Sequence, residues 1–98
     1  MTSPRRLASL AMTLFLVERY LADIDRQELE TLPARLDAAA TKLRRSGIEI
    51  SYLDSTFLPA EESCFCRFEA PSQHATELVN RIAGARFSRI SAAVTLVP

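Results

Sequence analysis

Residues 13–20 read Thr-Leu-Phe-Leu-Val-Glu-Arg-Tyr, a short segment rich in strand-forming residues that predicts a β-strand. Successive side chains of a strand point to opposite faces of its sheet. Phe15 and Val17 therefore share one face, while Leu14 and Leu16 share the other. A sheet with one face in water should alternate apolar and polar residues. Because this strand is apolar on both faces, we expect both faces of its sheet to be covered.

An amphipathic helix is predicted after this strand. Leucine and alanine recur every three or four residues over 29–43, which is the spacing of a helix that buries one face. Pro33 has no N–H, and inside a helix its ring clashes with a preceding carbonyl. We therefore expect Thr31 to cap the main body of the helix, after a separate turn at residues 26–30. Gly47 is expected to end it.

The remaining segments complete the order of elements. Their residue patterns predict strands at 48–58 and 63–69, joined as a hairpin, and a last strand at 90–97. A second helix is expected between an N-cap at Ser72 and a stop at Gly84. This order fits an α+β, ferredoxin-like βαββαβ fold, which is a four-stranded antiparallel sheet with both helices on one face. We predict that the uncovered face packs against a second copy or lies under a lid.

Length and charge limit the classes of function. A chain of 98 residues provides a core for one domain, which we place at residues 12–98, with residues 1–11 as an N-terminal tail. The 12 basic and 12 acidic residues balance, so the broad positive potential that attracts nucleic acid or anionic membranes is not expected. The longest uncharged stretch, residues 7–17, is too short to span a bilayer. We therefore expect a cytoplasmic protein with no nucleic-acid or membrane partner.

The two cysteines are expected in the core. Cys64 and Cys66 share one face of the predicted strand with Phe68, and free cysteine is among the most buried residue types. A zinc site would need a second pair of Cys or His residues, which a chain with two Cys and one His cannot supply. Same-face neighbours on a strand are also about 6.6 Å apart, at the upper edge of the disulfide range. We favour a packing role over a metal or redox role.

A candidate site lies on the opposite face of the same strand. Arg67 and Glu69 are expected there, with Glu18, Tyr20 and Tyr52 as the predicted neighbours. Carboxylates, an arginine and phenols in one cavity would suit acid–base chemistry or the binding of a small molecule. An ion pair between Glu18 and Arg67 is the simpler interpretation, because paired charges at interfaces are common without chemistry.

A candidate metal site lies on the second predicted helix. His74, the single histidine, precedes Glu77 by three residues, and side chains at this spacing lie on the same face of a helix. An imidazole and a carboxylate could together hold a divalent metal, although such a pair is also common on a solvated helix surface. A neighbouring chain would have to supply further ligands.

Four segments carry a resemblance to a known family. They are Phe-Leu-Val-Glu-Arg-Tyr-Leu at 15–21, Tyr-Leu-Asp-Ser-Thr-Phe-Leu-Pro at 52–59, Ser-Cys-Phe-Cys-Arg-Phe-Glu-Ala-Pro-Ser at 63–72, and Ala83-Gly84 before Phe-Ser-Arg-Ile at 87–90. In them the chain resembles a mainly actinobacterial family of small ferredoxin-like proteins of unknown function, often labelled nickel-binding. The resemblance implies a compact homodimer, ferredoxin-like or shaped like a dimeric α/β barrel, with Ni²⁺ as its metal and no established reaction. One departure is Gly84-Ala85-Arg86, where relatives tend to carry Gly-Leu-Pro.

Two functions from different classes follow. The first is a small cytoplasmic binding or accessory protein of that nickel-binding family, a homodimer through the uncovered sheet face with no catalysis of its own. The second is an enzyme of the dimeric α/β barrel type, an isomerase or a cofactor-free oxygenase, that uses Glu18, Glu69, Tyr20 or Tyr52 on a small molecule between two sheets. A closed cavity at these residues would favour the enzyme, and a filled, salt-bridged interface would favour the accessory protein.

Overall fold

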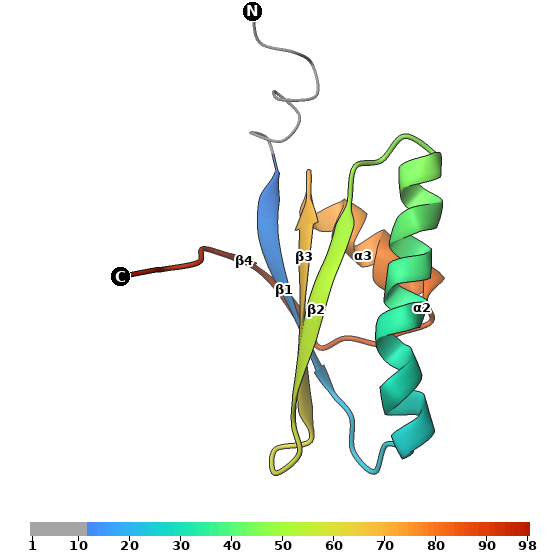
Figure 1. Ribbon diagram of the computed structural model, residues 1–98, viewed down its shortest axis with the longest axis vertical. Coiled ribbons are helices and arrows are strands. Elements are labelled where there is room, and N and C mark those ends of the chain that lie inside the picture. The colour runs from blue at the N-terminus through green and yellow to red at the C-terminus, as the bar shows by residue number, and fades with distance from the viewer. Residues whose placement is uncertain (1–11) are drawn as a thin grey trace, which may run out of the picture.

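The computed structural model describes residues 12–98, and the predicted tail at 1–11 lies outside the described residues. The elements are β1 (Thr13–Tyr20), α2 (Arg26–Arg45), β2 (Ser51–Leu58), β3 (Ser63–Ala70), α3 (Gln73–Ile82) and β4 (Arg89–Ala93). All pairings are antiparallel, in the order β2-β3-β1-β4. Both helices cover the same face of the sheet (Figure 1). The predicted βαββαβ fold is confirmed.

The core lies between the helices and one face of the sheet. Phe15 and Val17 of β1 face it together with Cys64, Cys66 and Phe68 of β3, and all five are buried. The predicted alternation of these two strands is therefore confirmed. Apolar residues of both helices close the layer from the other side, and those of α2 have the predicted spacing: Leu32, Leu36, Ala39, Ala40 and Leu43 of α2, and Ala75 and Val79 of α3.

A charged side chain also lies in this core. Arg19 of β1 is 1% exposed, and its guanidinium reaches across to α3 and the turn that follows it. Nη2 donates to Oδ1 of Asn80 at 2.6 Å, and Nη1 donates to the carbonyls of Ala85 and Arg86 at 3.3 and 3.0 Å. These bonds join the middle of the sheet to the end of the second helix. The alternation of β1 predicts the side to which Arg19 points but not these partners.

Helix α2 corrects the prediction for its first turn. The helix is continuous from Arg26, and the carboxylate of its N-cap Asp25 accepts from Gln27 N at 2.7 Å. Thr31 is not the cap, because its hydroxyl donates to the carbonyl of Glu28 within the helix. Pro33 lies inside the helix on its exposed side. Water can there satisfy the carbonyl whose intrahelical bond Pro33 removes.

Two strands differ in length from the prediction. β2 begins at Ser51 and has a bulge between Tyr52 and Asp54. β4 ends at Ala93, and the residues after it continue as an extended arm that leaves the body of the molecule (Figure 1). The apolar side chains of this arm have exposed fractions of 80% or more: Val94, Leu96 and Val97. Among residues 12–98, no helix has the length and apolar character needed to cross a membrane.

Replacing Pro33 tests the account of α2. Pro33→Ala restores one intrahelical hydrogen bond and removes a steric conflict, so we expect the free energy of unfolding to rise by about 1–3 kcal/mol. Urea denaturation measures this change. The control is Glu30→Ala, which removes only the exposed i,i+4 pair with Arg26 and should lower stability by less than about 0.5 kcal/mol. A Pro33→Ala protein less stable than wild type would contradict the account.

Candidate functional site

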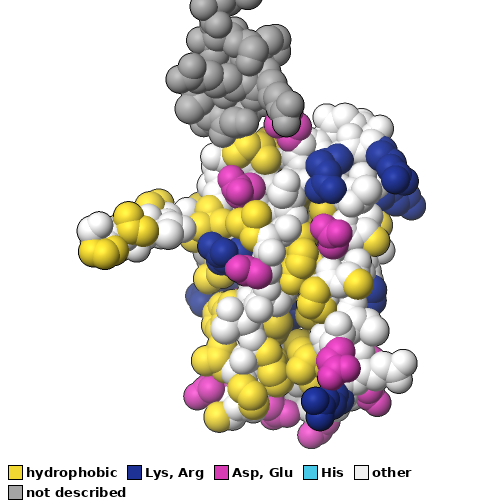
Figure 2. All heavy atoms as spheres, in the orientation of Figure 1, with side chains coloured by type: hydrophobic (Ala, Val, Ile, Leu, Met, Phe, Trp, Pro, Cys, Tyr) yellow, Lys and Arg dark blue, Asp and Glu magenta, His cyan; other side chains and the backbone are white. Residues whose placement is uncertain are grey.

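The sheet face opposite the helices is the surface that the sequence singles out. We call it the outer face. Its side chains come from all four strands: Leu14, Leu16, Glu18, Tyr20, Asp54, Thr56, Leu58, Phe65, Arg67, Glu69 and Arg89. Hydrophobic side chains run down the sheet side of the molecule and along the C-terminal arm (Figure 2). The outer face thus combines apolar side chains, which the sequence of β1 predicts, with five charged side chains.

The charges of the outer face are paired with one another. Arg67 donates from Nε and Nη2 to the two carboxylate oxygens of Asp54, each at 2.7 Å. Arg89 Nη2 lies 2.8 Å from Oε2 of Glu18. The expected pair between Glu18 and Arg67 is therefore wrong. The bulge in β2 explains the change, because it turns Asp54 to the outer face directly opposite Arg67.

The bidentate pair shifts the acidity of both partners. The hydrogen bonds from Arg67 hold the pKa of Asp54 below its usual value. The same contact raises the pKa of Arg67, which stays a cation in any case. Both side chains are well exposed to solvent, so the pair contributes modestly to stability. Neither group is left free to act as an acid or a base.

Tyr52 does not lie on the outer face. It is opposite Phe68 in the register of β2 with β3, and the two ring centroids are 5.4 Å apart. Its hydroxyl lies 2.6 Å from Oγ of Ser55, which in turn donates to Sγ of Cys66 at 2.8 Å. Burial raises the pKa of Tyr52. The proposed grouping of Tyr52 with Glu18 and Arg67 is thus wrong, since Tyr52 belongs to the helix-covered side.

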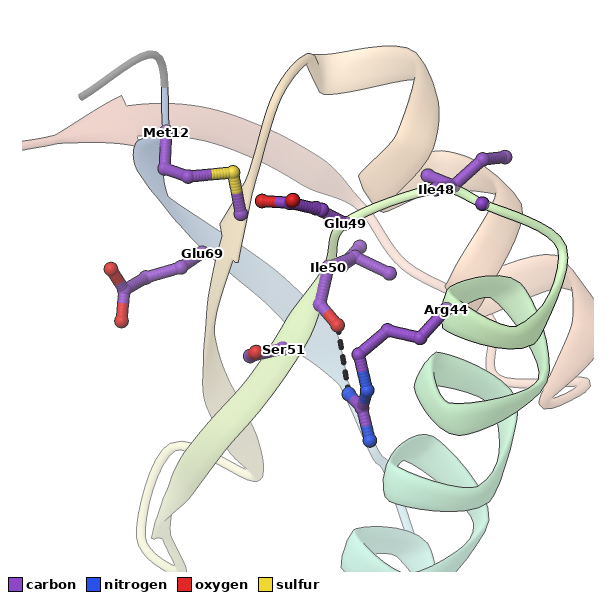
Figure 3. A pocket seen from close by; sticks show the side chains of 8 residues that line it. Met12, Arg44, Ile48, Glu49, Ile50, Ser51 and Glu69 are labelled. Atoms are coloured by element: carbon purple, nitrogen blue, oxygen red, sulfur yellow. Dashed lines mark hydrogen bonds between the residues drawn. The ribbon is translucent and has the colours of Figure 1, made fainter. Parts of the chain in front are cut away.

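The other two candidates lie at opposite ends of the sheet. Tyr20 is 63% exposed, and its hydroxyl reaches Oε1 of Glu62 at 3.4 Å. Glu69 lines an open hollow of about 560 Å³. Figure 3 shows Met12 and Glu49 beside Glu69 there, while Arg44 is engaged with the carbonyl of Ile50 at 2.8 Å. The outer-face candidates therefore do not converge on one closed cavity within a single chain.

His74 and Glu77 do come together. They lie in the first turns of α3, and Nδ1 of His74 is 3.9 Å from Oε2 of Glu77. The imidazole is 77% exposed, so an ion from solution can reach it. In the part of the chain that the structure describes, no group of three or more His, Cys, Asp or Glu side chains could hold a metal. The predicted metal site therefore has two donors from one chain.

Sequence reasoning missed several polar residues of the structure. Asp54 replaces Glu18 as the partner of Arg67 because of the bulge in β2. No residue pattern near Leu53 predicts that bulge. Asn80 accepts a hydrogen bond from Arg19, and Ser55 donates one to Cys66, on the helix-covered side of the sheet. Asn80 lies one residue after Val79 on a helix, so its burial is visible only once the helix is packed.

Comparisons with known proteins identify a family and a fold. A family model described as "Nickel responsive protein SCO4226-like" matches residues 15–92. The crystal structure of SCO4226 from Streptomyces coelicolor A3(2) superposes with a TM-score of 0.68 at 20% sequence identity, covering 86% of this chain and 99% of that chain. At this identity the superposition shows a shared fold. No protein with curated annotation matches the sequence.

Asp54→Asn tests the outer-face ion pair through pH. A carboxylate whose pKa is lowered in the folded state stabilises the protein above its unfolded pKa, about 3.9, and this stabilisation is lost as pH falls through the folded pKa. At about pH 7 we expect Asp54→Asn to lower the free energy of unfolding by less than about 1 kcal/mol, because the pair is exposed. The difference from wild type should shrink below about pH 4. Urea denaturation over a pH series measures it.

Asp37→Asn, on the exposed side of α2, is the control for this series. It replaces one carboxylate by an amide away from Arg67 and should show no comparable pH-dependent difference. A constant difference between Asp54→Asn and wild type from about pH 7 to about pH 3 would contradict the assignment.

Proposed function

The chain belongs to the SCO4226-like family of nickel-responsive proteins, and on this basis we propose that it is a small cytoplasmic accessory protein that acts as a homodimer and binds Ni²⁺, with no catalysis of its own. The paired charges of the outer face are the observation that carries the choice between accessory protein and enzyme. Glu18 and Arg67, which an enzyme would need free, are each engaged with another side chain. Such a surface, on which apolar side chains lie among charges that are mostly salt-bridged, suits an interface.

The proposed dimer joins two copies through their outer faces. Leu16 and Phe65 lie near the middle of this face and are only half-buried in one chain. Apolar side chains that stay partly exposed side by side favour an interaction site. The C-terminal arm adds Val94, Leu96 and Val97 beyond β4. A second copy of the same chain covers such a face symmetrically, because the same patch is presented by both partners.

The proposed nickel site is the His74/Glu77 pair. Imidazole nitrogen and carboxylate oxygen are donors that Ni²⁺ accepts in square-planar or octahedral geometry. Two side chains leave most of its coordination positions to water or to donors from a second chain. These two side chains therefore suit an open metal site on the surface of α3, shared with water or a second chain, and not a site enclosed by one chain. Two free, buried cysteines agree with a reducing compartment such as the cytoplasm.

Nickel titration by calorimetry tests the metal site. We expect His74→Ala to weaken Ni²⁺ binding at least about tenfold, because the chain then has no imidazole to offer. Glu77→Gln should weaken it in the same direction. Glu28→Gln, which removes an exposed carboxylate from the first turn of α2, is the matched control and should bind as wild type does. Equal affinity in wild type and His74→Ala would remove this pair from the proposal.

Sedimentation velocity at low micromolar concentration tests the dimer. We expect wild type to sediment at twice the mass of one chain, and Phe65→Glu to shift it to the monomer, because a charge would be buried in the interface without a partner. Ile82→Glu makes the same change at an exposed apolar residue of α3 and should leave the dimer intact. A monomeric wild-type protein, or a dimer that Phe65→Glu leaves unchanged, would contradict the outer-face interface.

A further inference from the structure

The sulfur of Cys66 lies within a polar cluster inside the core. Ser55 donates its hydroxyl proton to Cys66 Sγ at 2.8 Å, and Cys64 Sγ lies 3.9 Å from the same atom. Because the Ser55 proton is directed to sulfur, the 2.6 Å contact between Tyr52 and Ser55 has Tyr52 as its donor. A chain of donors thus runs from half-buried Tyr52 through Ser55 to Cys66. A cysteine that only fills space needs no such donors.

A full positive charge is buried beside this cluster. Arg19 is directly opposite Cys64 in the register of β1 with β3, which makes Cys66 its diagonal neighbour. The terminal nitrogens of Arg19 bond only to neutral oxygens, and its Nε has no hydrogen-bond partner among the described residues. A buried charge is costly unless an opposite charge compensates it. The surroundings of Arg19 therefore favour an anion nearby. The two thiols lie beside it on β3, and three carboxylates, Asp23, Asp25 and Glu28, line the same open hollow as Arg19.

The two thiols differ in acidity, and their surroundings explain the difference. The hydrogen bond with Cys64, together with the charge of Arg19 and the hydroxyl of Ser55, lowers the pKa of Cys66 despite its burial. The same hydrogen bond and burial raise the pKa of Cys64. Cys64 is thus the S–H donor of the pair, and Cys66 is the acceptor. A neighbouring arginine lowers the pKa of a cysteine thiol and so favours the thiolate, which is the nucleophilic form.

We propose that Cys66 is a core thiolate that balances the charge of Arg19 and is oxidised by hydrogen peroxide. The sulfur attacks one peroxide oxygen, so that an S–O bond forms, the O–O bond breaks and hydroxide leaves. Sulfur gives two electrons to the peroxide, the hydroxide takes a proton from solvent to become water, and Cys66 becomes a sulfenic acid. The pair Cys64 and Cys66 is poorly spaced for a disulfide, since residues at this spacing on a strand are about 6.6 Å apart.

The position of the site selects the oxidant by size. Cys66 has an exposed fraction of 0%, but β2, which carries Tyr52 and Ser55, is an edge strand of the sheet. Ser55 contacts the sulfur directly and Tyr52 contacts Ser55, and both of these side chains are half-buried. A small neutral molecule such as hydrogen peroxide needs a slight opening of the edge strand to reach the sulfur, and edge regions open more easily than the core. Larger thiol reagents need a wider opening.

The first experiment follows thiolate ultraviolet absorbance in the folded protein during a pH titration. We expect wild type to contain one thiolate at neutral pH, because the pKa of Cys66 lies below the usual cysteine pKa of about 8.5. Cys66→Ser should abolish it, whereas Cys64→Ser, the matched control, should keep a thiolate at position 66. Ser55→Ala should raise the apparent pKa, because a hydrogen bond to the charged sulfur is lost. Two thiols that both titrate at or above about pH 8.5 would overturn the proposal.

The second experiment exposes folded wild-type protein to hydrogen peroxide, followed by unfolding with a β-diketone trap and peptide mapping by mass spectrometry. We expect oxidation of Cys66 in large excess over Cys64, and a rate about tenfold lower in Ser55→Ala. In denaturant both thiols should react alike, which provides the internal control. Equal oxidation of the two cysteines in the folded protein, or protection of both, would overturn the proposal. Ser55→Ala keeps it testable should Cys66→Ser fail to fold.

Discussion

The buried guanidinium of Arg19 is the interaction on which the placement of α3 against the sheet depends. It starts from β1, which pairs with both β3 and β4, and its bonds reach α3 and the turn that leads to β4. Hydrogen bonds to a charged group are stronger than neutral ones, and a buried charge that loses its partners is strongly destabilising. The central strand, the second helix and the last connection can therefore not shift independently.

Much of the fold could be predicted because alternation along β1 and β3 is regular. The period of two correctly placed Val17, Cys64 and Cys66 on the helix-covered face, and the order of elements followed from helix and turn signals. The predictions fail where the same residue is compatible with two local structures. Pro33 was expected near the start of its helix, but Asp25 provides an earlier cap and the exposed position tolerates the proline.

The candidate site was less predictable for a related reason. A bulge adds one residue to β2, so the side chains after it point to the opposite faces from those that simple alternation predicts. Asp54 therefore lies on the outer face, opposite Arg67. Partners in an ion pair depend on this register. Glu18 consequently pairs with Arg89 from β4, a strand on the other side of β1. The sequence thus predicted the outer face as a surface but not the pairing of its charges.

The two chemistries that we propose for this small domain use different residues. Ni²⁺ prefers nitrogen and oxygen donors that water can reach, and the exposed His74/Glu77 pair is of that kind. Cys66 is a buried sulfur with Arg19 as its neighbour, and the reaction that we propose for it is a two-electron oxidation by a small oxidant. The two sites lie on different elements, α3 and β3, and have no residue in common. Loss of the metal pair should therefore leave the thiolate intact, so the two chemistries can be separated by single substitutions.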